Sequence, residues 1–165
     1  MLNSKFLCKY KLFIINTLDK IAIHNALLSL IDKKYELLSK ELSDILESTA
    51  NESKSTVGDK HETGRAMAQL EQEKLSNQIG ELERVRAFLF QINPNIKCLK
   101  VAIGSLVETN MGWYYISAGL GIIQHVGCQV FTMNIQAPLG KMLSEKIEGD
   151  IINWNGKELT IKNIY

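Results

Sequence analysis

The chain has 165 residues, of which 45% are hydrophobic, and 19 lysines and arginines face 18 acidic residues for a net charge of +1. This hydrophobic content predicts a folded protein with one core of ordinary size or two small ones, rather than a disordered chain. The near-zero net charge excludes a general electrostatic attraction to nucleic acid or anionic lipid, so such a partner has to be met by local charge.

The cysteines and the first twenty residues indicate the cellular compartment of the protein. The chain has three cysteines, Cys8, Cys98 and Cys128. An odd number without CxxC spacing favours a reducing compartment, and we predict a cytoplasmic protein. In residues 1–20, Lys9 and Lys11 interrupt an apolar run and no cleavage site of small residues follows, so we interpret this segment as a lead-in rather than an export signal. No run approaches the eighteen or so apolar residues of a membrane span, so we expect no membrane partner.

Two heptad patterns follow the lead-in. The first alternates strictly between spacings of three and four, at Leu28, Ile31, Tyr35, Leu38, Leu42 and Ile45. The second repeats every seven residues, at Ala68, Leu75, Leu82 and Leu89, with Ile79, Gln72 and Arg86 between. A polar segment at residues 48–58 separates them and favours a turn. We therefore predict an antiparallel coiled-coil hairpin over residues 21–92, with helices of roughly 25 residues and its tip near residues 58–63.

The sequence changes character after Pro94, which lacks an amide hydrogen and ends the second helix. Short β-forming runs at residues 99–107, 113–118 and 129–135 are separated by glycines. Residues 138–145 predict one short helix, and residues 151–164 predict a closing hairpin with a type I′ turn at Asn155-Gly156. We thus expect residues 97–165 to form a small β-rich domain, and the fold class to be α+β.

An acidic pair, Asp59 and Glu62, lies at the expected tip in the stretch TVGDKHETGRAM. Asp followed three residues later by Glu matches a capping box at a helix N-terminus, where negative charge is favourable. Carboxylates at this spacing also share one side of a helix and can bind Mg²⁺, which takes one or two protein carboxylates and keeps water or phosphate oxygens elsewhere. Such an exposed pair would hold the ion only weakly, so a metal role requires a partner that supplies more ligands. Both interpretations stay open.

The hairpin, the tip GDKHET, and the later segments APLGKMLSEKIEGD and NGKELTIKNI together resemble the Gre family of bacterial transcript cleavage factors, from about residue 28 to the C-terminus. The resemblance implies an FKBP-like domain at residues 97–165 that docks at the mouth of the RNA polymerase secondary channel, while the coiled coil enters the channel. It implies that Asp59 and Glu62 help hold the second Mg²⁺ of the polymerase and orient the water that cuts the 3′ end of backtracked RNA. The protein would be an accessory factor and not itself an enzyme, and we expect it to be a monomer with no tightly bound cofactor.

Two departures from the family's tip pattern, and the enzymes that share the FKBP-like fold, suggest alternative functions. Tips of that family commonly carry Asn directly after the Glu and Tyr four residues after it, where this chain has Thr63 and Ala66. The alternative function is therefore a secondary-channel regulator that binds RNA polymerase without promoting cleavage. FKBP-like domains also include prolyl isomerases, but residues 97–165 are short for a complete isomerase pocket.

Other polar and aromatic residues are weaker candidates for a functional role. Three cations and a histidine lie around the acidic pair, namely Lys54, Lys60, Arg65 and His61. They are ordinary solvated charges unless they steer RNA phosphates or titrate near neutrality. His125 and Cys128 have a spacing that a metal site uses, but His24 and Cys98 stand at no recognisable spacing from them, so packing is favoured. In the aromatic run at residues 113–115, strand alternation buries at least one ring.

Overall fold

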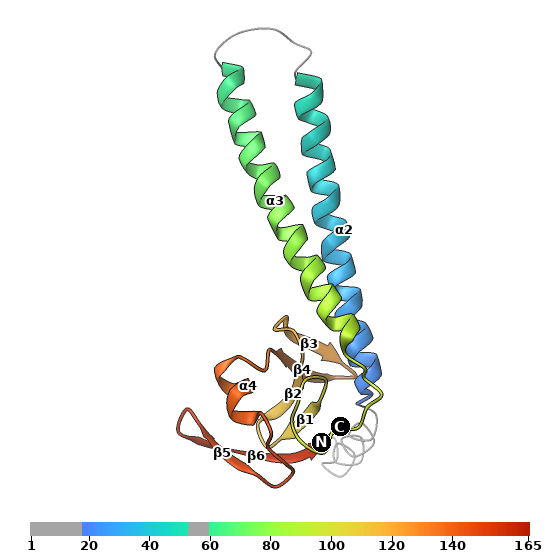
Figure 1. Cartoon of the computed structure of the whole chain (residues 1–165), viewed down its shortest axis with the longest axis vertical. Coiled ribbons are helices and arrows are strands. Elements are labelled where there is room, and N and C mark those ends of the chain that lie inside the picture. Colours follow the sequence, from blue (N-terminus) through green and yellow to red (C-terminus); the bar gives the residue numbers. More distant parts are fainter. Residues whose placement is uncertain (1–17, 53–59) are drawn as a thin grey trace, which may run out of the picture. The chain divides into compact units, whose positions relative to one another are not determined.

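The computed structural model describes residues 18–52 and 60–165, with the backbone alone at residues 51, 52 and 60–62. It confirms the predicted α+β class, because a hairpin of two long helices is followed by a six-stranded mixed sheet (Figure 1). The helices of the hairpin are α2, Lys20–Glu52, and α3, Lys60–Gln91. The chain divides into two compact units, which we call the hairpin unit, Leu28–Phe88, and the sheet unit, formed by residues 18–27 together with Leu89–Tyr165.

The heptad positions form the face along which α2 and α3 pack in the hairpin unit. Ile31 and Leu75 are buried, and Tyr35, Leu42 and Ile45 are half-buried. The lysines and glutamates between these positions are exposed, so the apolar stripe is narrow, as in a coiled coil. Within the described residues, no helix is both long enough and apolar enough to span a bilayer.

The first helix extends further than the sequence predicts. We expected a break from residue 48, but α2 continues to Glu52. The Ser48 and Thr49 hydroxyls donate to the Ile45 carbonyl oxygen at 2.9 and 2.8 Å. Hydroxyls that bond the preceding helical turn no longer compete for the backbone in a turn conformation, so these residues are compatible with a helix. At the other end, Asp19 Oδ1 accepts from the Ile21 amide at 2.9 Å and caps α2.

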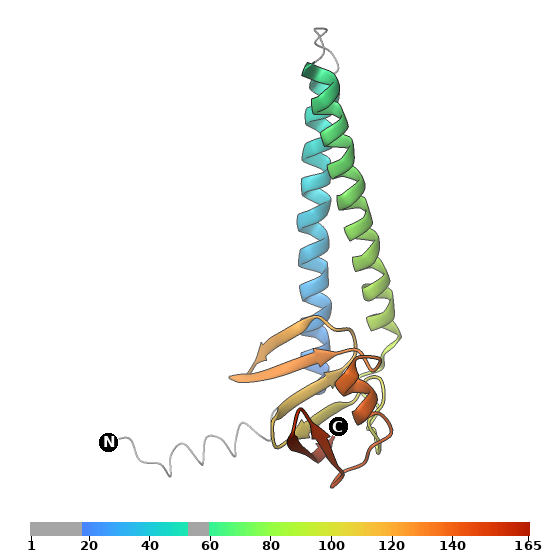
Figure 2. The same cartoon turned by 90° about the vertical axis from the view of Figure 1, so that its left-hand side faces the viewer.

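The sheet runs in the order β3-β4-β2-β1-β6-β5. The strands are β1, Leu106–Thr109; β2, Gly112–Ile116; β3, Gly121–His125; β4, Cys128–Met133; β5, Ile151–Trp154; and β6, Lys157–Ile164. All neighbours are antiparallel except β2 and β4, which pair in parallel with Tyr114 opposite Phe131. A single parallel pair makes the sheet mixed, and it places the β3-β4 hairpin at one edge (Figure 2).

Several sequence predictions for the sheet unit are confirmed. The short helix is α4, Pro138–Leu143, with proline at its start. Asn155 and Gly156 join β5 to β6 with φ of 52° and 76°, and two positive φ values are the mark of a type I′ turn. Helix α3 ends at Gln91, three residues before Pro94.

Two predictions for the strands are wrong. Of the strand expected at residues 99–107, only the end belongs to β1, because Gly104 turns the chain at φ 90° and Ser105 Oγ bonds both the amide and the carbonyl of Ala102. Strand β3 was not predicted at all. Val126 and Gly127 join β3 to β4 with φ of 47° and 74°. A β-branched residue such as valine disfavours positive φ, so the sequence does not indicate a turn at this position.

The core of the sheet unit has two faces. One face packs under α4 and contains Val107, Tyr114, Ile116, Leu143, Leu159 and Ile161. Tyr115 points to the opposite face, where its hydroxyl meets His24 from the first turns of α2. Ile23 and Leu27 on these turns are fully buried.

Candidate functional site

The hairpin turn connects Glu52, the end of α2, to Lys60, the start of α3. Asp59 lies outside the described residues. Glu62 is the third residue of α3, and its side chain is likewise not described. The placement of the acidic pair therefore stays a prediction, and the structure describes the helices on either side of the turn.

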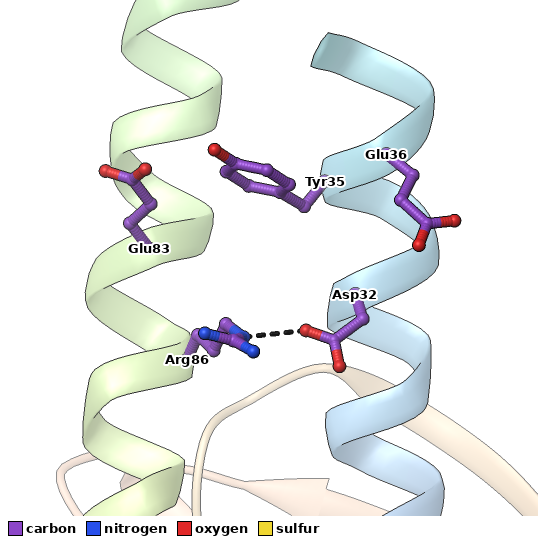
Figure 3. A pocket seen from close by; sticks show the side chains of 5 residues that line it. All are labelled: Asp32, Tyr35, Glu36, Glu83 and Arg86. Carbon is purple, nitrogen blue, oxygen red and sulfur yellow. Dashed lines mark hydrogen bonds and ion pairs between the residues drawn. The ribbon is translucent and has the colours of Figure 1, made fainter. Parts of the chain in front are cut away.

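An ion pair joins the two helices of the hairpin. Arg86 Nε donates to Asp32 Oδ1 at 2.7 Å, which joins α3 to α2 (Figure 3). Tyr35 and Glu83 line the same groove. The two helices therefore run antiparallel with Asp32 beside Arg86.

The first described side chains of α3 are all exposed. Thr63, Arg65 and Ala66 face solvent, and Met67 is 68% exposed. These residues follow Glu62 directly, so no hydrophobic core reaches this end of the helix among the described residues. The departures from the Gre pattern, Thr63 and Ala66, therefore lie where a partner has direct access to them.

Charge is distributed unevenly between the two units. Positions 28–88 hold twelve acidic residues against nine basic ones, a net charge of −3. The rest of the chain holds six acidic residues against ten basic ones, a net charge of +4, which together give the overall +1. The hairpin unit is accordingly acidic and the remainder basic.

A water-accessible groove opens between the helices of the hairpin unit. It has a volume of about 470 Å³ and is lined by Asp32, Tyr35, Glu36, Glu83 and Arg86 (Figure 3). Arg86 occupies a heptad position, where its guanidinium bonds Asp32 instead of packing as an apolar side chain would. In the part of the chain that the structure describes, no group of three or more His, Cys, Asp or Glu residues is arranged to hold a metal ion.

A buried polar pair lies in the sheet unit. His24 Nδ1 and Tyr115 Oη are 2.9 Å apart, and the two side chains are 4% and 0% exposed. Burial lowers the pKa of His24 and raises that of Tyr115. One helical turn earlier, Lys20 Nζ donates to the Ile96 carbonyl oxygen at 2.5 Å, and burial lowers the pKa of Lys20. No local sequence pattern indicates the His24–Tyr115 pair, because its members are 91 positions apart.

The remaining candidates divide between packing and solvent. His125 and Cys128 face each other across the β3-β4 hairpin, without a third ligand among the described residues. Tyr114 and Tyr115 are buried, which confirms that the aromatic run contributes to the core. Arg65 is exposed. Lys54 and the side chains of Lys60 and His61 lie outside the described residues.

Comparison with known proteins gives no match, whether to a protein-family model, to a curated protein or to a solved structure. The architecture expected from the Gre resemblance is nevertheless present, since a long helical hairpin precedes a small mixed β-sheet domain. Any conclusion about function therefore depends on the residues of this chain, above all on those that lead into the hairpin turn.

Proposed function

We propose that this protein is a Gre-like transcription elongation factor. Its hairpin turn enters the secondary channel of RNA polymerase, where Asp59 and Glu62 contribute ligands to a Mg²⁺ ion that drives cleavage of backtracked RNA. The observation that supports this proposal is the long helical hairpin itself, because its two helices end at Glu52 and begin at Lys60, on either side of Asp59 in the sequence.

The dimensions of the hairpin unit suit insertion into a channel. From Leu28 to Glu52, α2 provides 25 residues, which at 1.5 Å per residue is roughly 37 Å. Two packed helices, each about 10 to 12 Å in diameter with side chains, make a narrow pole of that length. A helical hairpin of this length can carry the side chains at its turn further into a channel than a surface loop can.

The chemistry suits a shared metal. Mg²⁺ takes one or two carboxylates from a protein and retains water or phosphate oxygens at its other positions. Asp59 and Glu62 match that number, and the polymerase and the RNA would supply the remaining oxygens. In a two-metal site the two ions together stabilise the attacking and leaving oxygens of the phosphodiester that is cleaved. The protein acts here as an accessory monomer of the cytoplasm, and the polymerase remains the enzyme.

The exposure of Thr63 and Ala66 favours a second candidate function. Both positions are accessible on the first turns of α3, and neither offers the amide or the phenol of the common Gre tip. A factor that occupies the channel without orienting the attacking water would regulate RNA polymerase without promoting cleavage. The two functions share the partner and the hairpin and differ only in the reaction.

A transcript-cleavage assay tests the proposal. Backtracked elongation complexes receive the wild-type protein and Mg²⁺, and released 3′ RNA fragments are measured. The test variant is the double change Asp59→Ala and Glu62→Ala. Its matched control is Asp44→Ala and Glu47→Ala, which removes two exposed carboxylates of the same spacing from α2, about 12 Å before its end.

We expect release of RNA with the wild type and the control, and no release with the test variant, although all three bind polymerase. Binding without release by the wild type would favour the regulator. Equal loss in both variants would assign the effect to the overall acidity of the hairpin rather than to the tip. A wild-type protein that does not bind polymerase would refute both functions.

A further inference from the structure

Two aromatic rings meet at the surface of the sheet unit. The rings of Trp113 on β2 and Tyr165, which follows β6, have centroids 5.8 Å apart and planes tilted by 33°. Trp113 is half-buried and Tyr165 is 36% exposed, so the pair lies at the surface rather than in the core. The face of an aromatic ring attracts cations, and tryptophan attracts them most strongly.

The strand register places this aromatic pair and a carboxylate on the same face of the sheet. Glu108 on β1 lies directly opposite Trp113 on β2. Tyr165 exchanges backbone hydrogen bonds of 2.9 and 3.1 Å with Leu106, two residues before Glu108. Directly paired residues point to the same side of a sheet, and so do residues two apart on one strand. Trp113, Tyr165 and Glu108 therefore share one face.

Two carboxylates flank the rings, and neither has a cation. Glu108 Oε2 accepts from Asn163 Nδ2 at 2.7 Å. Glu148 Oε1 accepts from the amide of Ile164, the neighbour of Tyr165, at 2.8 Å. The pKa of the Tyr165 hydroxyl is raised by burial and then by the charges of Glu108 and Glu148, so both carboxylates act on this ring. Neither forms an ion pair with a lysine or arginine of residues 18–52 and 60–165.

We call Trp113, Tyr165, Glu108 and Glu148 the Trp113 surface. Its two negative charges have neutral hydrogen-bond donors but no positive charge beside them. Carboxylates next to aromatic faces favour a ligand that is both positively charged and partly apolar, such as a lysine side chain.

The first turns of α2 lie on the same face of the sheet as the Trp113 surface. Tyr115 is opposite Leu106, and its hydroxyl meets His24 of α2 at 2.9 Å. Tyr115 and Tyr165 are both partners of Leu106, so they are two strand spacings apart, about 10 Å. Lys20, which begins α2, is about one helical turn from His24. With the lengths of the side chains included, the start of α2 is within roughly 25 Å of Tyr165.

Residues 1–17, which lie outside the described residues, directly precede this point and have a complementary composition. They contain Lys5, Lys9 and Lys11 among apolar residues and no acidic residue. At about 3.3 Å per residue, the nine steps from Lys11 to Lys20 span up to roughly 30 Å, which is enough to reach the Trp113 surface. A ligand joined to its target in one chain acts at an effective concentration on the order of millimolar.

The hairpin unit is acidic too, but several of its carboxylates already have cations. Its three ion pairs measure 3.1, 2.6 and 2.7 Å and join Glu71 to Lys74, Glu81 to Arg84, and Asp32 to Arg86. The two carboxylates of the Trp113 surface have no such partner among the described residues. Charge complementarity therefore favours the Trp113 surface as the target of residues 1–17.

We propose that residues 1–17 dock on the Trp113 surface of their own chain, with a lysine ammonium against the aromatic pair and beside Glu108 and Glu148. The segment is then an internal ligand that covers a cation-binding surface of the sheet unit. A basic segment of another protein reaches that surface only by displacing residues 1–17. The inference is independent of the hairpin turn and of the proposed function in transcription.

Carbodiimide coupling of the dilute full-length protein tests the contact. The reagent joins a lysine amine to a carboxylate that touches it, forming an amide while the carbodiimide takes up the water as a urea, and mass spectrometry of a digest identifies the joined residues. Trp113→Leu removes the larger ring and leaves both carboxylates. Its matched control is Trp154→Leu, because Trp154 packs against the core on the α4 side of the sheet. Thermal unfolding checks that each variant is folded.

We expect amides between the lysines of residues 1–17 and Glu108 or Glu148, formed within single molecules. Trp113→Leu should lower the coupling rate roughly two- to fivefold, the range of an exposed cation–π contact, and Trp154→Leu should couple like the wild type. High salt should lower the rate as well, because the charges at this surface are screened.

A second measurement leaves the Trp113 surface unchanged. In a Trp154→Phe background, acrylamide quenching of fluorescence reports on the solvent access of Trp113 alone. The triple change Lys5→Gln, Lys9→Gln and Lys11→Gln should increase quenching. The control changes three exposed lysines of α2 to glutamine, Lys33, Lys34 and Lys40, and should not alter it.

Three results would overturn the inference. Coupling of the three lysines mainly to carboxylates of the hairpin unit would place residues 1–17 there instead. Amides that form only between two molecules, at a rate that falls on dilution, would assign the Trp113 surface to the segment of a second copy. Equal quenching with and without the three lysines, together with a coupling rate that Trp113→Leu leaves unchanged, would show that the aromatic pair stays open to solvent.

Discussion

The buried pair His24–Tyr115 predicts a pH-dependent stability of the sheet unit. The side chain of His24 is 4% exposed, and burial lowers its pKa below the ordinary value of 6.5. When both ring nitrogens of His24 carry a proton, Nδ1 is a donor and Tyr115 Oη can accept, so the hydrogen bond survives protonation whichever tautomer the neutral ring has. The cost of protonation is the burial of a charge.

The sign and size of the effect follow from proton linkage. Between the depressed folded pKa and 6.5, the unfolded chain binds more protons at position 24 than the folded chain does. The free energy of unfolding therefore falls as the pH drops below 6.5, and it levels off once the folded pKa has been passed. One proton limits the slope to about 1.4 kcal/mol per pH unit.

Urea unfolding between pH 5 and 8, followed by tryptophan fluorescence, measures this slope. The two tryptophans, Trp113 and Trp154, both belong to the sheet unit and report on its unfolding. We expect His24→Gln to abolish the slope and His125→Gln, a change at a half-buried histidine on β3, to preserve it. If His24→Gln retained the wild-type slope, the decline in stability would have to come from other groups and the reasoning would be refuted.

Glycine and leucine pairs give further predictions for stability, measured by chemical denaturation. Gly140→Ala should lower the free energy of unfolding by about 3 kcal/mol or more, because a Cβ there would collide with the Asn134 carbonyl oxygen. Gly80→Ala should raise the free energy of unfolding by about 0.5–1 kcal/mol, because Gly80 lies in α3 with open space around it. Destabilisation by both changes would contradict this. Leu75→Ala should cost about 2–4 kcal/mol, since Leu75 is 2% exposed, and Leu70→Ala, at 66% exposure, should change stability by less than about 0.5 kcal/mol. Equal losses of stability from the two leucine changes would show that the heptad positions, which include Leu75, do not form the packed face of α3.

The sequence predicted the hairpin and the closing strands because their signals are local. A heptad seam is visible in spacing alone, and Asn155-Gly156 is the commonest type I′ turn. Strand β3 escaped prediction for the same reason. Its turn uses Val126 at φ 47°, and the strands on either side of the turn pair from Gly121 opposite Thr132 to His125 opposite Cys128. At this turn, tertiary contacts outweigh the local preference of valine against positive φ.

The candidate site shows the same division between local and distant information. The Asp-x-x-Glu pattern is evident in the sequence, and its place at the hairpin turn stays a prediction, whereas the register of the two helices is visible only in the structure. A heptad pattern permits several registers, each shifted by one repeat. The ion pair between Asp32 and Arg86, which are 54 positions apart, distinguishes one of them. Residues 99–103, LKVAI, predict a strand from local pattern, but in the structure they form a loop in which Val101 is buried.

The net charge of +1 excluded a general attraction to a charged partner, but it concealed two opposed charges. Positions 28–88 carry −3 and the rest of the chain +4. At physiological salt, charges separated by more than about 8 Å are largely screened from each other, and the hairpin helices run for roughly 37 Å. A carboxylate at the hairpin turn is therefore independent of a lysine near the opposite end of those helices. A partner would meet each unit through its own local field, so the sum over the chain predicts the behaviour of neither unit.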